Sequence, residues 1–294
     1  MKVAIFGQFY HQNAEEAIKI LFDYLEKKNG DFFIEETFLQ IINSQINPDE
    51  NAYHFNTFKT LDDSFDLLIS IGGDGTILRA ITFVKDKSIP IVGINTGRLG
   101  FLATIQNNRI ETAMDHIFEG RYKISERSLL EVKTTPSNKN MENLNFALNE
   151  ITVSRKNTTS MITVDTHLNG EYLTSYWSDG LIVSTPTGST GYSLSCGGPV
   201  IDPHAESFVL TPIAPHNLNA RPLVIKDTTE IQLKVSGREH QHLISLDSRI
   251  ATLDNETLIT ISKAPFKIKM IELLDESFLD TLRKKLLWGE DKRN

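Results

Sequence analysis

One turn of this sequence places a carboxylate among glycines, in the stretch Ile71-Gly72-Gly73-Asp74-Gly75-Thr76. The apolar run 67–71 before it predicts a buried parallel strand, and the apolar spacing of 77–84 after it predicts a helix. Glycines let the main chain come close to a ligand, and a helix N-terminus supplies N–H groups that suit phosphate. The residues expected to contact phosphate are Gly72, Gly73, Gly75 and Thr76.

Asp74 is the unusual member of this turn, because a carboxylate repels phosphate. It could accept a proton from a hydroxyl group, or bind a divalent cation that also binds phosphate. The alternative is a tight turn in which the aspartate is only a local cap. The complete Gly-Gly-Asp-Gly-Thr pattern between strand and helix favours phosphoryl chemistry. It resembles the signature of the superfamily that groups NAD kinases, diacylglycerol-type lipid kinases and 6-phosphofructokinases.

Three further segments could bind a ligand, although each alone also fits an ordinary loop or strand. Residues 93–102 form a second glycine-containing strand end, which should lie near Asp74 because parallel strands end at one edge of a sheet. Asn149 and Glu150 offer donors and acceptors for sugar hydroxyls and base edges, and within a strand they would point to opposite faces. Residues 178–195 are rich in hydroxyl groups and glycine, and Tyr192 could stack on a ring.

The elements that must position these segments predict two domains. Alternating strands and helices over residues 1–121 predict a doubly wound, Rossmann-like α/β domain. Short β-type runs over residues 122–270 predict an all-β C-terminal domain. Residues 271–294 contain a helix, ended by Gly289, which should return to the first domain because its apolar side needs a partner.

Composition narrows the class of protein. The chain has 294 residues, is 40% apolar, and carries a net charge of −8 from 30 basic and 38 acidic residues. An acidic chain without a basic cluster argues against general nucleic-acid binding. The single cysteine, Cys196, excludes an internal disulfide. Without a signal peptide or a membrane-spanning run, we expect a cytoplasmic protein with no membrane partner.

Taken together, the four segments closely resemble the bacterial NAD kinase family in order and spacing. Residues 197–201 and 214–224 match that family as well, so the resemblance runs from Ile69 to about Val224. Two positions depart from the family pattern. Gly191 stands where alanine is frequent, and Ser248 follows Asp247 where glycine is expected, which leaves the role of that second loop open.

The resemblance implies a reaction and a set of site residues. The γ-phosphoryl group of ATP would pass, with a divalent metal such as Mg²⁺, to the 2′-hydroxyl of the adenosine ribose of NAD. Asp74 matches the proton acceptor and Gly75 lies beside it, while Arg79 stands one helical turn on, within reach of phosphate. Asn149 and Glu150 match the pair on the adenosine side. The residues assigned to the rest of NAD are Asp179, Thr187, Thr190, Gly191, Tyr192, Ser193, Leu194, Ser195 and Ala214. The family is usually oligomeric, which implies a homodimer or homotetramer.

Two other functions share the Asp74 turn. A lipid or other small-molecule kinase would need an apolar groove, and the polar segment 185–195 argues against one. A non-catalytic NAD(P) sensor would not need a carboxylate at position 74. The sequence therefore favours an NAD kinase over both.

Overall fold

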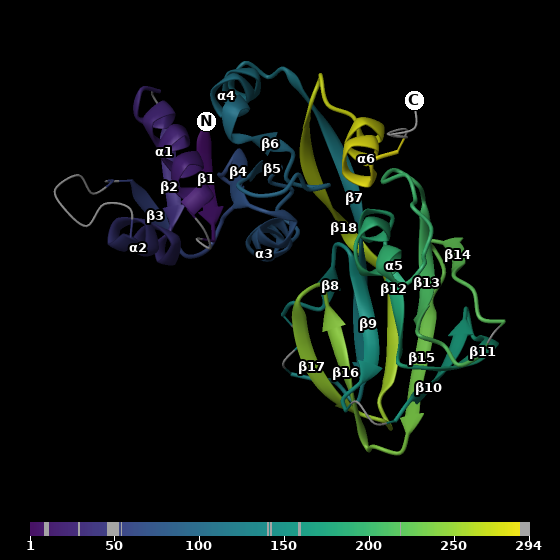
Figure 1. Cartoon of the computed structure of the whole chain (residues 1–294). Helices are drawn as coiled ribbons and strands as arrows, with labels where there is room; N and C mark the ends of the chain where they lie inside the picture. The colour runs from purple at the N-terminus through teal and green to yellow at the C-terminus, as the bar shows by residue number, and fades with distance from the viewer. Residues whose placement is uncertain are drawn as a thin grey trace. The chain divides into compact units, whose positions relative to one another are not determined.

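The computed structural model describes residues 1–8, 12–28, 30–45, 53, 55–139, 141, 143–157, 160–217 and 219–288, with only the main chain of residues 12, 13 and 45. The chain forms two compact units, Met1–Glu126 with Ile268–Asn294, and Arg127–Lys267 (Figure 1). Two long strands, β7 (Tyr122–Thr135) and β18 (Leu258–Leu273), each contribute residues to both units.

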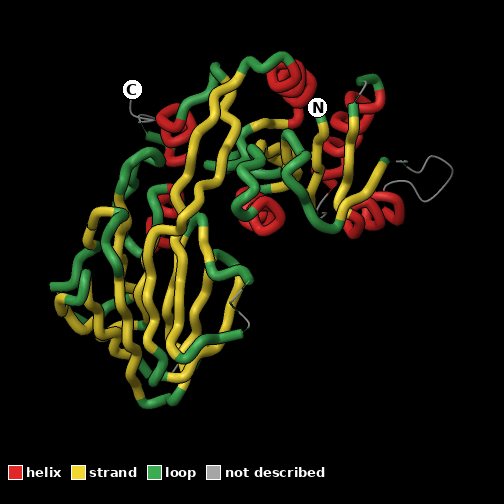
Figure 2. The backbone as a smooth tube through the Cα atoms, turned by 180° about the vertical axis from the view of Figure 1, so that it is seen from behind, coloured by secondary structure: helices red, strands yellow, loops and turns green. Residues whose placement is uncertain are grey.

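The first unit is built on a parallel sheet with helices packed against it (Figure 2). Its strands are β1 (Lys2–Gly7), β2 (Asp31–Glu35), β3 (Asn56–Phe58), β4 (Leu67–Gly72), β5 (Ile91–Asn95) and β6 (Ile105–Gln106). Its helices are α1 (Gln12–Glu26), α2 (Glu36–Gln45), α3 (Asp74–Val84), α4 (Ile110–Phe118) and α6 (Phe278–Leu286), with a 3₁₀ turn η1 (Asn107–Arg109) before α4. The strand order β3-β2-β1-β4-β5, with β6 beside β5, is that of a doubly wound nucleotide-binding domain. The predicted fold class is confirmed.

The strand order also explains where the glycine turn lies. All six residues of β4 are buried, and α3 buries the face formed by Thr76, Ile77, Ala80, Ile81 and Val84. The chain leaves β1 for β2 on one side and leaves β4 for β5 on the other, so the order reverses between β1 and β4. Ligands of such sheets bind beyond the carboxyl ends of the strands at this reversal. The turn 72–74 follows β4 at that point.

The C-terminal helix packs on the first unit, as predicted. The ring of Phe278 in α6 lies 6.2 Å from the ring of Phe101, and the ammonium group of Lys285 lies 5.0 Å from the same ring. Arg109 donates hydrogen bonds to Asp275 and Glu276 just before the helix. The helix ends at Leu286, and Gly289, which was expected to end it, lies outside the described residues.

The second unit consists of two antiparallel sheets. One has the order β11-β10-β15-β18 and the other β14-β13-β12-β9-β16-β17, while β8 pairs with β7. Their bounds are β8 (Phe146–Ala147), β9 (Glu150–Arg155), β10 (Ile162–Leu168), β11 (Glu171–Ser178), β12 (Gly180–Ser184), β13 (Ser207–Ile213), β14 (Leu223–Lys226), β15 (Ile231–Gly237), β16 (Gln241–Leu246) and β17 (Arg249–Asp254). Apolar side chains from both sheets form one core, as sandwich packing requires. Within its described residues, the helical segments are η2 (Thr187–Thr190) and α5 (Tyr192–Ser195), so the predicted β-rich class is confirmed.

The structure differs in several places from the elements predicted from the sequence. The strand predicted over 145–155 is divided into β8 and β9 by a bend at Leu148 and Asn149. The expectation that Asn149 and Glu150 alternate along one strand is therefore wrong. Helices α2 and α4 and strand β17 were not predicted individually. Among the described residues, no helix has the length and apolar content needed to cross a bilayer.

Candidate active site

The turn after β4 is open to a ligand on one side. An added Cβ at Gly72 would lie 2.2 Å from the hydroxyl oxygen of Thr76, so only glycine fits there. At Gly73 and Gly75, an added Cβ would meet no described atom within 4 Å. Helix α3 begins at Asp74 after the N-cap Gly73, which has no side chain to cap the helix, while the Thr76 N–H donates to the Gly73 carbonyl oxygen at 2.9 Å. The first N–H groups of the helix and the partial positive charge of its N-terminus suit a phosphate.

The Asp74 carboxylate is fixed by a second loop of the first unit. The main-chain N–H of Phe101 donates to Oδ2 at 2.8 Å, and those of Leu102 and Ala103 donate to Oδ1 at 3.0 and 2.9 Å. An added Cβ at Gly100 would lie 1.9 Å from Oδ1, so only glycine at position 100 lets that loop come this close to Asp74. Asp74 is thus a cap for a distant loop, not for its own turn. Since a carboxylate offers about four acceptor positions, about one, on Oδ2, remains for a ligand.

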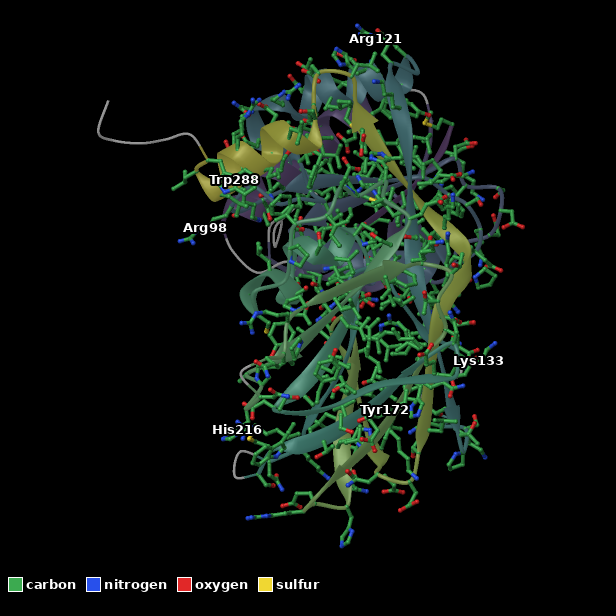
Figure 3. All side chains as sticks on the ribbon, turned by 90° about the vertical axis from the view of Figure 1, so that its right-hand side faces the viewer. Arg98, Arg121, Lys133, Tyr172, His216 and Trp288 are labelled. Atoms are coloured by element: carbon green, nitrogen blue, oxygen red, sulfur yellow. The ribbon has the colours of Figure 1, made fainter. Side chains whose placement is uncertain are left out.

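Asn95 holds this second loop in shape and was not among the predicted site residues. Its amide nitrogen donates to the carbonyl oxygens of Arg98 (2.9 Å) and Ala103 (3.1 Å), and its Oδ1 accepts from the Gly97 N–H (2.8 Å). Asn95 is buried at the end of β5. A polar residue at the end of an otherwise apolar strand was the available signal. Arg98 on this loop and Arg79 on α3 both have exposed side chains (Figure 3 labels Arg98).

In the second unit, the bend at Asn149 is packed against the glycine- and hydroxyl-rich loop. The Thr185 N–H donates to the Asn149 carbonyl oxygen at 2.9 Å, and the Thr185 hydroxyl donates to the Leu148 carbonyl oxygen at 2.5 Å. An added Cβ at Gly188 would lie 2.1 Å from the Asn149 carbonyl oxygen. At Gly191 it would lie 3.3 Å from Glu150 Oε2, so a side chain at this position would meet that oxygen closely.

This bend carries two buried polar atoms that the described residues leave without a partner, Asn149 Oδ1 and Glu150 Oε2. A buried oxygen without a donor is costly, and native proteins rarely keep one without a use. Burial and the nearby Asp247 carboxylate raise the pKa of Glu150 to about 8, against one main-chain hydrogen bond from Tyr192. Near neutral pH this carboxyl group is therefore mostly protonated.

The other residues assigned to NAD differ in the exposure and the hydrogen bonding of their side chains. The Ser193 hydroxyl is buried against that of Thr211 at 2.8 Å, and the Thr190 hydroxyl donates to the Thr187 carbonyl oxygen at 3.2 Å. The Tyr192 ring is 46% exposed and available for stacking. Leu194 is partly buried and Ser195 exposed on α5, while Asp179 forms an ion pair with Arg155 at 2.9 Å. Ala214 follows β13 with a φ of +43°.

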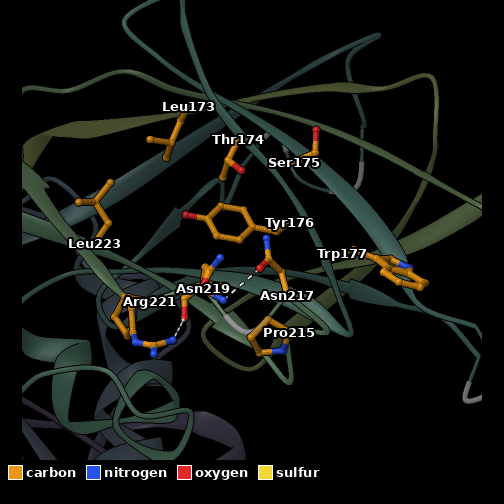
Figure 4. Close-up of a pocket in the computed structure, with 12 residues that line it drawn as sticks. Leu173, Thr174, Ser175, Tyr176, Trp177, Pro215, Asn217, Asn219, Arg221 and Leu223 are labelled. Atoms are coloured by element: carbon orange, nitrogen blue, oxygen red, sulfur yellow. Dashed lines mark hydrogen bonds between the residues drawn. The ribbon is translucent and has the colours of Figure 1, made fainter.

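The first unit thus assembles Gly72, Gly73, Asp74, Gly75, Thr76 and the loop 97–103, and the second assembles Asn149, Glu150 and residues 185–195. A hollow of about 350 Å³ elsewhere in the second unit lies between β11 and residues 215–223 (Figure 4). Its Arg221 donates to the Ala220 carbonyl oxygen, and its Asn217 side chain accepts from the Asn219 N–H. The two unpartnered oxygens are not part of it.

Two family models match the chain, each over a different part of it. Residues 3–122 match the model of the ATP-NAD kinase N-terminal domain, and residues 148–273 match that of the ATP-NAD kinase C-terminal domain. The chain is 61% identical to an NAD kinase of Christiangramia forsetii and 60% identical to one of Flavobacterium psychrophilum, in each case over the full length of both chains.

Two solved structures resemble the chain over nearly its whole length. An NAD kinase from Archaeoglobus fulgidus in complex with ATP has a TM-score of 0.75 at 26% identity, covering 98% of this chain and 99% of the other. Yeast NADH kinase complexed with NADH has a TM-score of 0.86 at 22% identity, covering 100% and 89%, and supports the fold alone.

Proposed function

Since this chain belongs to the ATP-NAD kinase family, we propose that it transfers the γ-phosphoryl group of ATP to the 2′-hydroxyl of the adenosine ribose of NAD, forming NADP. The observation that carries the proposal is Asp74, a carboxylate fixed by three N–H groups at an open helix N-terminus whose N-cap is a glycine. That arrangement pairs a phosphate-binding surface with a proton acceptor.

Asp74 acts as the general base in this proposal. Its remaining acceptor position on Oδ2 takes the proton of the 2′-hydroxyl as that oxygen attacks the γ-phosphorus. The bond from the γ-phosphorus to the β–γ bridging oxygen breaks, and ADP leaves with the electron pair. The N–H groups at the start of α3, with Gly72, Gly73, Gly75 and Thr76, stabilise the charge on the phosphoryl oxygens. Arg79, one turn along α3, adds positive charge.

The side chains available as metal ligands indicate how a cation would be bound. Among the described residues, no group of three or more acidic, histidine or cysteine side chains could hold a metal ion alone. Mg²⁺ is commonly held by substrate phosphates, water and few carboxylates, which fits this turn with its one carboxylate. When bound, the cation offsets the charge of the triphosphate. We propose that it enters with ATP, bound by the triphosphate oxygens and water, because the one acceptor position left on Asp74 takes the proton of the 2′-hydroxyl.

Asn149 and Glu150 bind the adenosine side of NAD in this proposal. The unpartnered Asn149 Oδ1 accepts a hydrogen bond from an amino or hydroxyl group, and the neutral Glu150 carboxyl group can both donate and accept. Tyr192 supplies a stacking surface. The remainder of NAD is assigned to Asp179, Thr187, Thr190, Gly191, Ser193, Leu194, Ser195 and Ala214.

Assembly, location and domain limits remain proposals. The second unit exposes large apolar side chains, including Tyr172 and Trp177 on β11, which are each at least half-exposed. Such exposure supports a homodimer or homotetramer. Figure 3 labels Tyr172. Light scattering would give the mass of the assembly. A cytoplasmic location and the domain limits 1–121 with 271–294, and 122–270, stay predictions from the sequence.

One incubation separates the proposed function from its rivals. The protein is mixed with ATP and Mg²⁺ and with either NAD or diacylglycerol, and products are separated by chromatography. We expect NADP and ADP in equal amounts from the first mixture and no phospholipid from the second. A phosphorylated lipid would favour a lipid kinase, and NAD binding by calorimetry without NADP would favour a sensor. The Asp74→Asn variant is the matched control.

A further inference from the structure

Asp247 makes a set of hydrogen bonds to the Asn149 bend that its own hairpin does not explain. It stands in the two-residue turn between β16 and β17, and its side chain is 1% exposed. Its carboxylate accepts three consecutive N–H groups, from Leu148 on Oδ2 at 3.0 Å, and from Asn149 and Glu150 on Oδ1 at 2.8 and 3.3 Å. The Asp247 N–H in turn donates to the Glu150 carbonyl oxygen at 3.0 Å.

A neighbouring arginine holds the other end of the same bend. Arg249 lies 3.7 Å from Asp247 Oδ2 and donates to the carbonyl oxygens of Leu144 (2.7 Å) and Phe146. Its guanidinium group also lies 5.2 Å from the centre of the Phe146 ring. Asp247 and Arg249 therefore fix the main chain on both sides of Leu148, from one hairpin.

The backbone conformation of Asp247 indicates that this position requires an aspartate side chain. Its φ of +52° lies in the left-handed region, which glycine adopts most easily and which aspartate and asparagine tolerate. Glycine would relieve this strain but leave the partly buried N–H groups of Leu148, Asn149 and Glu150 without their acceptor. No other described side chain of the hairpin accepts from these N–H groups, so without Asp247 the Asn149 Oδ1 and Glu150 Oε2 atoms would no longer be held in place.

We propose that Asp247 is a positioning residue for NAD, which holds the bend 148–150 so that Asn149 and Glu150 meet the adenosine. This inference rests on the proposed function. Asp247 itself does not touch the substrate, so its loss should weaken NAD use through those two residues and leave ATP use nearly unchanged.

The test uses two replacements in the full chain. Asp247→Asn keeps the shape of the side chain and its φ preference. Its NH₂ group, however, would face a main-chain N–H group that donates to the carboxylate in the wild type. Asp247→Gly removes the acceptor without backbone strain. The matched control is Asp227→Asn, since Asp227 is also a buried carboxylate of the second unit and is paired with Lys263, far along the chain from the bend.

The measured quantities are KM for NAD, KM for ATP, kcat and Tm. We expect both Asp247 variants to raise the KM for NAD by about tenfold or more, with the KM for ATP within about twofold of wild type. Asp227→Asn should lower Tm without changing either KM. An Asp247 variant with a lower kcat and Tm but an unchanged KM for NAD would show a purely structural role and overturn the inference.

Failure of this inference is separable from failure of the proposed function. A wild-type protein that makes no NADP would refute the function. A wild-type protein that makes NADP, together with Asp247 variants whose KM values for NAD and ATP rise equally, would refute the positioning role alone. If neither Asp247 variant folds, Asp247→Glu supplies the measurement: it keeps the charge and moves the acceptor, and an unchanged KM for NAD would count against positioning.

Discussion

Replacing Asp74 with asparagine should affect both turnover and stability, for separate reasons. A ribose hydroxyl is a weak acid and a weak nucleophile, and an amide cannot take its proton. General-base assistance is worth about 10²–10⁴-fold, so we expect kcat for NADP formation to fall by roughly that factor. Since phosphoryl transfer depends mainly on positioning and electrostatics, some activity should remain. NAD affinity should change little.

The stability effect follows from the three hydrogen bonds to Asp74. From the sequence alone the turn needs only the shape of its residues, which predicts no change in stability. In the structure, asparagine Oδ1 can still accept from Leu102 and Ala103, but its NH₂ group would face the Phe101 N–H. Losing one hydrogen bond to a charged acceptor and leaving its donor unpaired costs about 1–3 kcal/mol. In a unit of this size, Tm should fall by roughly 2–12 °C.

The control for this experiment is Ser277→Ala, in the same unit. The Ser277 hydroxyl accepts from the Asp280 N–H at the start of α6, and losing such a cap costs about 0.5–2 kcal/mol without touching the turn. It should lower Tm to a similar extent and leave kcat unchanged. Kinetics are measured well below the Tm of each variant, with NAD affinity from calorimetry.

Two outcomes would contradict this reasoning. If Asp74→Asn retained kcat within threefold of wild type, Asp74 would not be the base. If its Tm matched that of wild type, the three hydrogen bonds would not anchor the loop. Gly100→Ala adds a further check, because its Cβ would displace the carboxylate without changing its chemistry, and it should also reduce kcat.

The remaining predictions concern the metal and the Asn149 bend. Activity should require a divalent cation, because the triphosphate and Asp74 share one turn, and full turnover in excess EDTA would refute this. Asn149→Ala should raise the KM for NAD by roughly 5- to 150-fold and that for ATP far less, whereas equal rises would remove Asn149 from the adenosine side. Glu150→Gln should be more stable than wild type at high pH. The folded-state pKa of Glu150, about 8, lies above its ordinary value of 4.5, so the stability that wild type has below pH 4.5 declines as pH rises through 8. Urea unfolding of both proteins at pH 5 and pH 9, without ligand, checks this, and an equal difference at the two pH values would contradict it.

Local patterns made the fold class and the Asp74 turn predictable. The turn, its buried strand and its amphipathic helix are contiguous in the sequence, so propensity and spacing describe them together. The approach of residues 101–103 to Asp74 was also within reach, because neighbouring parallel strands end at one edge. By contrast, the break between β8 and β9 at Asn149 was not predictable. Its residues have strand-like neighbours, and the acceptor that stabilises the bend comes from Asp247, about a hundred positions further along the chain.

The nature of Glu150 was equally hidden, because it depends on a second carboxylate. Burial raises the pKa of both Glu150 and Asp247, and their repulsion disfavours two charges. Asp247 accepts three N–H groups and lies beside Arg249, whereas Glu150 accepts one main-chain hydrogen bond and keeps Oε2 unpartnered. These contacts favour the charge on Asp247 and the proton on Glu150. A neutral carboxyl group suits uncharged hydroxyl and base-edge groups better than phosphate or a cation, which is the chemistry expected on the adenosine side of NAD.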